Sequence, residues 1–263
     1  MLDLKNIESF YPQALRPFKR NILREYLQYK ILEIIFDSSY GDRLAFMGGT
    51  AIQVVHGNTR FSEDLDFDNL SLKPDDFEGL TQEVVRQLKL AGLKTQVKTN
   101  LGNVFRSDIR FSDVLFGLGL TGHKEERILI RVDTQPQRFS YFPDKVIINK
   151  FDVFLRINVV PVDILLSQKF YAVLNRPRAM GRDFFDIVYL AGKTAPNYSY
   201  LEVKAGIKDI QQLKARLLDH CKDFDFKQLA LDVGPFLFVP GDVKKVVLFR
   251  EFLLESLKDG GHG

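Results

Sequence analysis

The apolar positions of this 263-residue chain change their spacing twice. Between residues 18 and 37 they recur at steps of three and four, which predicts an amphipathic helix. Short apolar or alternating runs then dominate as far as residue 160, interrupted by a helical pattern that opens at Pro74. After Pro161 the pattern is helical again. The chain therefore predicts an α+β protein, with a mixed sheet and flanking helices followed by a helical C-terminal lobe.

Turn residues and β-branched residues divide this pattern into elements. The predicted strands cover residues 44–47, 64–68, 93–99, 103–111, 127–132, 145–148 and 153–160. The predicted helices cover residues 18–37, 50–56, 73–90, 162–175, 182–192, 207–221, 226–232 and 242–258, and residues 259–263 are expected to fray. We predict two domains: residues 1–160, a sheet domain with an N-terminal helix, and residues 161–263, a helical domain.

The composition predicts a globular chain, because 45% of the residues are hydrophobic and can form a sizeable core. No apolar run is long enough to span a membrane, and no secretory signal is found, so we expect a cytoplasmic protein with no membrane partner. The single cysteine, Cys221, fits a reducing compartment. A net charge of +3 is too small to argue for nucleic-acid binding.

The first chemical pattern follows the predicted strand at residues 44–47. Its apolar run ends in Gly48-Gly49-Thr50, and backbone N–H groups at a glycine turn can approach phosphate oxygens because no Cβ intervenes. Thr50 opens a predicted helix, where its hydroxyl could bind phosphate or cap the helix. Asp64 and Asp66 then share one face of a strand, about 7 Å apart, and can share divalent metal. The stretch predicts a triphosphate cradle followed by a magnesium site.

A third carboxylate is expected, because two metal ions that bridge attacking and leaving oxygens need more than two ligands. Asp133 ends the apolar strand that begins at Ile128, which would bring the acid to a site at the end of the sheet. Its alternative role is to initiate the turn at Thr134-Gln135-Pro136. We predict the metal-ligand role for Asp133.

Three groups of residues resemble the abortive-infection AbiEii/AbiGii toxins, and their order along the chain makes the resemblance specific. They are residues 46–51 together with residues 60–67, residues 165–176, and residues 182–190. The resemblance covers about residues 40–195. It implies a nucleotidyltransferase fold and the toxin half of a type IV toxin–antitoxin pair.

The resemblance also implies roles for single residues. Lys169 would bind the triphosphate as a point charge, or would simply be a helix-surface lysine whose ammonium reaches solvent. Asp186 would act as a catalytic or site-supporting acid, or would form a helical ion pair with Arg182 four residues earlier. Arg60 and Ser62, beside the metal acids, could hold phosphate or cap the turn before the strand.

Positive charge is concentrated in residues 138–182, which carry eight Lys or Arg against three acids. Arg176, Arg178 and Arg182 lie in the connection between the two helices that carry the later motifs. A basic rim of this kind could bind an RNA acceptor, and the alternative is an ordinary salt-bridged surface.

Together these observations favour a metal-dependent nucleotidyltransferase toxin. Mg²⁺ held by Asp64, Asp66 and Asp133 would orient an NTP, and NMP would pass to an acceptor hydroxyl with release of pyrophosphate. The resemblance implies an RNA acceptor, with tRNA as the leading candidate, and a separately encoded antitoxin. Two alternatives are a small-molecule acceptor, as in aminoglycoside nucleotidyltransferases, and a non-catalytic scaffold that binds nucleotide. The presence of all three acids and the lysine argues against the scaffold.

Overall fold

A computed structural model of the protein describes residues 2–255 and residue 257. The described chain forms two compact units. The first unit comprises residues 2–56, 61–138 and 143–160, and the second comprises residues 57–60, 139–142, 161–255 and 257. Two short segments from the first 160 residues therefore pack with the helical C-terminal part.

A mixed sheet forms the centre of the first unit. In the described part of the chain it has seven strands, in the order β3-β4-β5-β2-β1-β7-β6. Strand β2 runs parallel to β5 and β1 runs parallel to β7, whereas the other neighbours are antiparallel. The strands are β1 (Leu44–Met47), β2 (Leu65–Asn69), β3 (Thr95–Leu101), β4 (Phe105–Phe111), β5 (Ile128–Gln135), β6 (Asp144–Lys150) and β7 (Val153–Val159).

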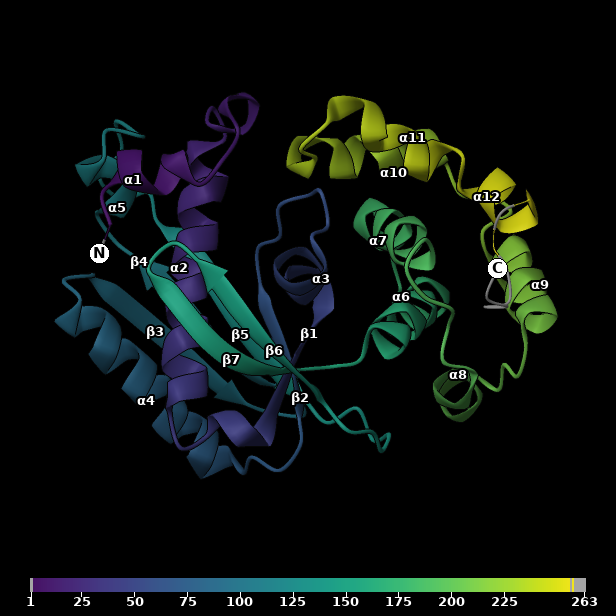
Figure 1. Ribbon diagram of the computed structural model, residues 1–263, viewed down its shortest axis with the longest axis horizontal. Helices are drawn as coiled ribbons and strands as arrows, with labels where there is room; N and C mark the ends of the chain where they lie inside the picture. Colours follow the sequence, from purple (N-terminus) through teal and green to yellow (C-terminus); the bar gives the residue numbers. More distant parts are fainter. Residues whose placement is uncertain (1, 256, 258–263) are drawn as a thin grey trace. The chain divides into compact units, whose positions relative to one another are not determined.

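Two long helices cover one face of this sheet. Helices α2 and α4 pack against each other and against the strands (Figure 1). Phe36 of α2 contacts Phe67 of β2, and Phe77 of α4 contacts Phe105 of β4, with ring centroids 6.1 and 5.7 Å apart. The helices of the first unit are α1 (Leu4–Ser9), α2 (Lys19–Asp37), α3 (Gly48–His56), α4 (Pro74–Leu90) and α5 (Val114–Gly117), with 3-10 turns at Gln13–Leu15 and Gly41–Arg43.

Helix α2 buries more than the single apolar stripe that the sequence predicted. Glu25 is 3% exposed, yet its carboxylate has partners on two other elements. One oxygen accepts a hydrogen bond from Gln53 Nε2 of α3 at 2.7 Å, and the other pairs with the ammonium of Lys150. Lys150 also lies over the ring of Tyr11, 4.2 Å from its centroid. A buried acid therefore connects α2 to α3 and to the end of β6.

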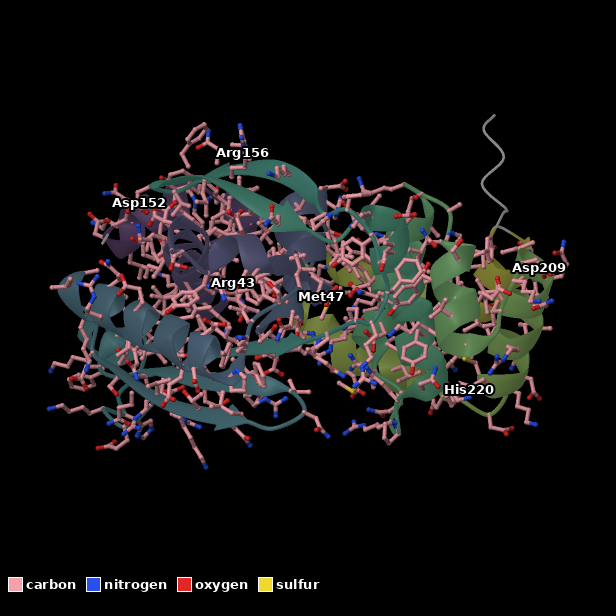
Figure 2. All side chains as sticks on the ribbon, turned by 90° about the horizontal axis from the view of Figure 1, so that it is seen from below. Arg43, Met47, Asp152, Arg156, Asp209 and His220 are labelled. Atoms are coloured by element: carbon pink, nitrogen blue, oxygen red, sulfur yellow. The ribbon has the colours of Figure 1, made fainter. Side chains whose placement is uncertain are left out.

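The second unit is helical and has an aromatic core. The ring of Phe184 packs edge-on against Phe226 and Phe249, with centroids 5.3 and 4.8 Å apart. Asp209 caps the N-terminus of α9 through its side chain, and Figure 2 marks the two ends of this helix with Asp209 and His220. The helices are α6 (Val162–Asn175), α7 (Gly181–Ala191), α8 (Tyr198–Ala205), α9 (Ile210–His220), α10 (Phe226–Val233), α11 (Lys244–Val247) and α12 (Phe249–Glu255), with 3-10 turns at Gly234–Phe236 and Pro240–Val243.

The predicted α+β class is confirmed, as are the mixed sheet with flanking helices and the helical C-terminal part. Helices α1, α5 and α8 were not predicted, and the first two are too short to show a helical period. The single helix predicted for residues 242–258 is instead a 3-10 turn followed by α11 and α12, which Leu248 separates. Its predicted end at Lys258, and the tail at residues 259–263, lie outside the described residues.

Among the described helices, none combines the length and the apolar character that crossing a lipid bilayer requires.

Candidate functional site

Asp66 and Asp133 are register partners on the parallel strands β2 and β5. Their side chains point away from the helix-covered face, because Phe67 and Val132, which alternate with them, are buried on that face. Asp64 lies just before β2, although the sequence predicted it as the first residue of this strand, and its Oδ2 lies 3.8 Å from Arg131 Nη1 of β5. Asp66 and Asp133 therefore lie side by side on one face of the sheet, and Asp64 approaches Arg131, which shares this face of β5 with Asp133.

Gly48 connects this acidic face to the start of α3. Its φ of +79° lies in the left-handed region that favours glycine. A Cβ at this position would lie 2.4 Å from Asp66 Oδ2, so only glycine leaves the carboxylate in place. The first N–H groups of α3, around Gly49, have no partner within the helix and form the kind of helix N-terminus that binds anions. Thr50 is buried, and its hydroxyl donates to the backbone oxygen of Asp64, which ties α3 to the acidic strand.

Two of the three acids pair with arginines that share their face of the sheet. Arg106 of β4 lies opposite Asp133 and donates to both carboxylate oxygens, from Nε at 2.8 Å and from Nη2 at 2.7 Å. Arg131 Nη1 lies 3.8 Å from Asp64 Oδ2, and Arg131 Nε lies 3.3 Å from Asp108 Oδ1. The hydrogen bonds to Asp133 raise the pKa of the Arg106 guanidinium.

The acids fit a divalent cation by type and by placement. Within the described residues, no three Asp, Glu, His or Cys side chains converge into a metal-binding cluster in this conformation. Carboxylate oxygens are nonetheless the ligands that Mg²⁺ prefers, and Asp66 and Asp133 come from neighbouring strands. Because Gly48 has no Cβ, the Asp66 carboxylate can lie directly against the start of α3.

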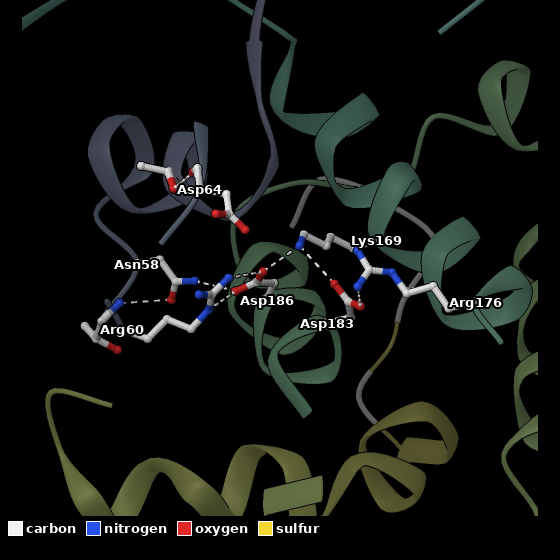
Figure 3. Close-up of polar contacts among 9 residues, drawn as sticks. Asn58, Arg60, Asp64, Lys169, Arg176, Asp183 and Asp186 are labelled. Carbon is white, nitrogen blue, oxygen red and sulfur yellow. Dashed lines mark hydrogen bonds and ion pairs between the residues drawn. The ribbon is translucent and has the colours of Figure 1, made fainter. Parts of the chain in front are cut away.

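A second group of charges is buried inside the second unit, around Asp186 of α7 (Figure 3). Arg60 donates from Nε to Oδ1 and from Nη2 to Oδ2 of this carboxylate, both at 2.7 Å. Asn58 Nδ2 donates to Oδ1 at 2.7 Å, and Lys169 Nζ lies 2.8 Å from Oδ2. Asp186 thus pairs with Arg60 and Lys169 rather than with Arg182, its neighbour along the helix.

Lys169 of α6 is held between two acids. It is 8% exposed, and its ammonium also donates to Asp183 Oδ1 at 3.0 Å. Arg176 Nη1, at the end of α6, lies 3.3 Å from Asp183 Oδ2. Lys169 is therefore not the solvent-reaching surface lysine that the sequence left as an alternative. In this conformation its charge is already neutralised by Asp183 and Asp186.

The electrostatics of Asp186 favour the site-supporting role over the catalytic one. Burial alone would raise the pKa of Asp186, but the positive charges of Arg60 and Lys169 outweigh burial and lower it to about 2. The side chain is completely buried. A carboxylate with so low a pKa is a weak base at neutral pH, and it has no proton to donate.

Several residues at these two groups were not singled out from the sequence. Arg106 and Arg131 face the acids only because of strand pairing, which the sequence does not reveal. Asp183 lies three residues before Asp186, and this helical spacing alone could have identified it as a partner on the same face. Ser62, which was predicted to lie at the site, is partly exposed, and its backbone oxygen accepts from Gln28 Nε2 at 3.1 Å.

The basic stretch between residues 138 and 182 is partly neutralised by ion pairs. Arg178 has an 80% exposed side chain and lies 3.5 Å from Asp232. Four of the eight cations are paired in this way: Lys150 with Glu25, Lys169 with Asp183 and Asp186, Arg176 with Asp183, and Arg178 with Asp232. For these four residues, the contacts agree with the alternative of an ordinary salt-bridged surface rather than a free basic rim.

A protein-family model described as "Nucleotidyl transferase AbiEii toxin, Type IV TA system" matches residues 30–234. No curated protein matches the chain. Among solved structures, JHP933 from Helicobacter pylori is 18% identical, with 90% of this chain and 93% of that one covered and a TM-score of 0.55. MenT4, a nucleotidyltransferase toxin from Mycobacterium tuberculosis H37Rv, is 16% identical, with coverages of 99% and 91% and a TM-score of 0.58. At these identities the similarity shows a shared fold.

The matched residues include the strands that carry Asp66 and Asp133 and the helices that carry Lys169 and Asp186. The family resemblance seen in the sequence is thus confirmed, and with it nucleotidyltransferase activity. The chain belongs to the AbiEii family of nucleotidyl transferase toxins, from type IV toxin–antitoxin systems.

Proposed function

We propose that this toxin is a metal-dependent enzyme of the cytoplasm that transfers NMP from an NTP to an RNA acceptor, in particular tRNA. It acts in an abortive infection system, and a separately encoded antitoxin neutralises it. The pairing of Asp66 with Asp133 on adjacent parallel strands, beside the start of α3, carries the proposal. This pairing combines acidic ligands with a helix N-terminus suited to phosphate.

In this proposal Asp64, Asp66 and Asp133 hold magnesium, in a two-metal arrangement. The metal, when bound, supplies neutralisation of phosphate charge and orients the α-phosphate. The backbone N–H groups at Gly48, Gly49 and Thr50 bind phosphate oxygens of the NTP. Since a Cβ at Gly48 would meet Asp66, glycine lets the cradle and the acid lie in contact.

The transfer itself is a displacement at the α-phosphorus. The acceptor hydroxyl oxygen forms a bond to this phosphorus, the bond to the bridging oxygen of the β-phosphate breaks, and pyrophosphate leaves. One of the three aspartates takes the hydroxyl proton. Catalysis then depends mainly on positioning and on charge neutralisation.

Triphosphate binding by Lys169 stays a prediction from the family resemblance, because its ammonium pairs with Asp183 and Asp186 in this conformation. In the proposal Asp186 has the site-supporting role, since it orients Lys169 through their ion pair. Direct phosphate contacts by Arg60 and Ser62 stay predictions, because Arg60 is 2% exposed and pairs with Asp186 in this conformation.

Removing either Asp64 or Asp66 tests the mechanism. The variants Asp64→Ala and Asp66→Ala should lose nucleotide transfer and growth inhibition, since the metal ligands would be incomplete, while their thermal unfolding stays near that of the wild type. Asp108→Asn is the matched control. Asp108 is on β4, on the same face of the sheet as Asp133, but it is outside the proposed ligand set. A toxic Asp64→Ala/Asp66→Ala double variant would contradict the mechanism.

The acceptor is tested separately. Incubation with each radiolabelled NTP and either total tRNA or a panel of small hydroxyl-bearing metabolites should label the tRNA. Label in a metabolite alone would replace the RNA acceptor with a small molecule. Label in neither, together with failure to bind Mg²⁺–NTP, would support the non-catalytic scaffold.

A further inference from the structure

The Arg106–Asp133 pair occupies a carboxylate that the proposed function assigns to metal. We propose that Arg106 is a nucleotide-binding residue that competes with the metal: its guanidinium occupies Asp133 until the metal arrives, and it then turns to a phosphate group of the NTP. This inference rests on the proposed function, since it takes Asp133 as a metal ligand.

The geometry of the pair explains why the two occupants exclude each other. Arg106 uses Nε and Nη2 to engage both oxygens of Asp133, at 2.8 and 2.7 Å. A guanidinium bound in this two-pronged manner uses one lone pair on each oxygen, on the side of the carboxylate that faces Arg106. A cation that approaches Asp133 from that side must therefore displace at least one of these hydrogen bonds.

Arg106 can leave Asp133 without disturbing the fold. Its side chain is 45% exposed, so little of it is packed in the interior. Within the described residues Asp133 is its only ion-pair partner. Arg131 differs, because Asp108 would still hold it if Asp64 changed partner.

The displaced guanidinium would stay close to the reacting groups. Arg106 lies directly opposite Asp133 in the strand register, and the charges of Asp108 and Asp64 also act on it. Once metal neutralises Asp133, the nucleotide triphosphate would offer the guanidinium a new anionic partner, since Asp108 is already paired with Arg110 and Arg131. The planar fork of arginine matches a phosphate as well as it matches a carboxylate.

Metal binding without nucleotide tests the first half. Titration of the full-length protein with Mn²⁺, followed by calorimetry, should show about fivefold tighter binding for Arg106→Ala than for the wild type, because the competitor is gone. Arg110→Ala is the matched control, since Arg110 lies on the same strand face but pairs with Asp108, and its Mn²⁺ affinity should be unchanged. Arg106→Gln provides a second variant of similar length, with the same expectation.

Nucleotide binding tests the second half. With saturating Mn²⁺, the α,β-methylene analogues of ATP, GTP, CTP and UTP are titrated separately, and the tightest binder should bind Arg106→Ala about tenfold more weakly. The two changes have opposite signs, which a general loss of structure cannot produce. Unchanged or weaker Mn²⁺ binding, or unchanged nucleotide binding, would overturn the proposal. If the role of Arg106 is overturned, the proposed function still holds provided that the wild type binds Mn²⁺ and Asp66→Ala does not. A wild type that binds no Mn²⁺ would overturn both the role of Arg106 and the proposed function.

Discussion

Four charged side chains meet inside the second unit: Arg60, Lys169, Asp183 and Asp186. Each is less than a tenth exposed, and their formal charges cancel. A buried charge is tolerated when it is paired and hydrogen-bonded, but becomes strongly destabilising when its partner is removed. The four residues therefore depend on one another, and Asp186 contacts two of the other three.

Replacing Asp186 with asparagine should destabilise the protein by about 3–5 kcal/mol at neutral pH, because Arg60 and Lys169 would lose a common partner. The free energy of unfolding in urea measures this loss. Asp232→Asn is the matched control: it removes an acid whose partner Arg178 is largely exposed, and it should change stability by less than about 1 kcal/mol. Equal stability of the two variants would show that the buried network contributes nothing specific.

Asp186 also makes the stability of the protein depend on pH in the acid range. Its pKa is lowered in the fold to about 2, so the stabilisation from ionised Asp186 is complete above about pH 4 and is lost as the pH falls toward that value. The difference in unfolding free energy between wild type and Asp186→Asn should therefore shrink between about pH 4 and pH 2.

At the scale of single residues, the sequence identified charged residues of the candidate site better than it identified the residues with which they pair. Helical spacing suggested Arg182 as the partner of Asp186, whereas the guanidinium that pairs with it lies 126 residues away in the sequence. Alternation along a strand is a local property, so the sequence could place Asp66 on the face opposite the buried Leu65 and Phe67, although β2 begins only after Asp64. Arg106 was missed because only the pairing of β4 with β5 brings it opposite Asp133.

At the scale of elements, the contact between α7 and α10 depends on one small residue. Gly181 begins α7, and a Cβ there would lie 1.9 Å from the backbone oxygen of Leu229 in α10. Backbone cannot move aside as a side-chain tip can, so the two helices approach this closely only with glycine. Helix α7 carries Asp183 and Asp186, and its position affects both.

Gly181→Ala should therefore destabilise the protein by about 1–3 kcal/mol, through displacement of α7 from α10. The melting temperature and the midpoint of urea unfolding measure the change. Gly192→Ala, at the other end of the same helix, is the control: its φ of −77° suits alanine and the nearest atom to the added Cβ is 3.6 Å away. An unchanged midpoint for Gly181→Ala would mean that the helices adjust without loss.

Elements with a strong local signal were predictable. The alternation in β5 and β7, the proline and acids at the start of α4, and the apolar helix α6 all follow rules that act within a few residues. The order of the strands in the sheet, and the parallel pairing of β2 with β5, depend on contacts between distant segments and did not emerge from the sequence.

At the scale of the whole molecule, Cys221 reports on the integrity of the second unit. It is completely buried at the end of α9, and burial raises the pKa of its thiol to about 12. The reactive thiolate is therefore scarce at pH 8, and reagents reach it only when the unit opens. Native protein should react with a thiol reagent at least about a hundredfold more slowly than protein unfolded in urea. Rapid labelling of the native protein would mean that α9 opens readily.

The overall class could be predicted because strand-rich and helix-rich regions follow each other along the chain. The two domains at residues 1–160 and 161–263 stay a prediction about folding, and the compact units in the structure are divided differently. Residues 57–60 and 139–142 pack with the second unit, and nothing in their local sequence marks them as belonging there.

The ion pair between Arg60 and Asp186 restricts which chimeras of two related proteins can fold stably. Arg60 lies in the segment 57–60, whereas its partner Asp186 lies more than a hundred residues downstream, beyond residue 160. A chimera of two relatives joined at residue 160 would take one half of this buried ion pair from each parent. The hybrid would keep the pair only if the parent of residues 1–160 supplies the arginine and the parent of the following residues supplies the aspartate. The C-terminal helices are therefore not an exchangeable cassette, although they are contiguous in the gene.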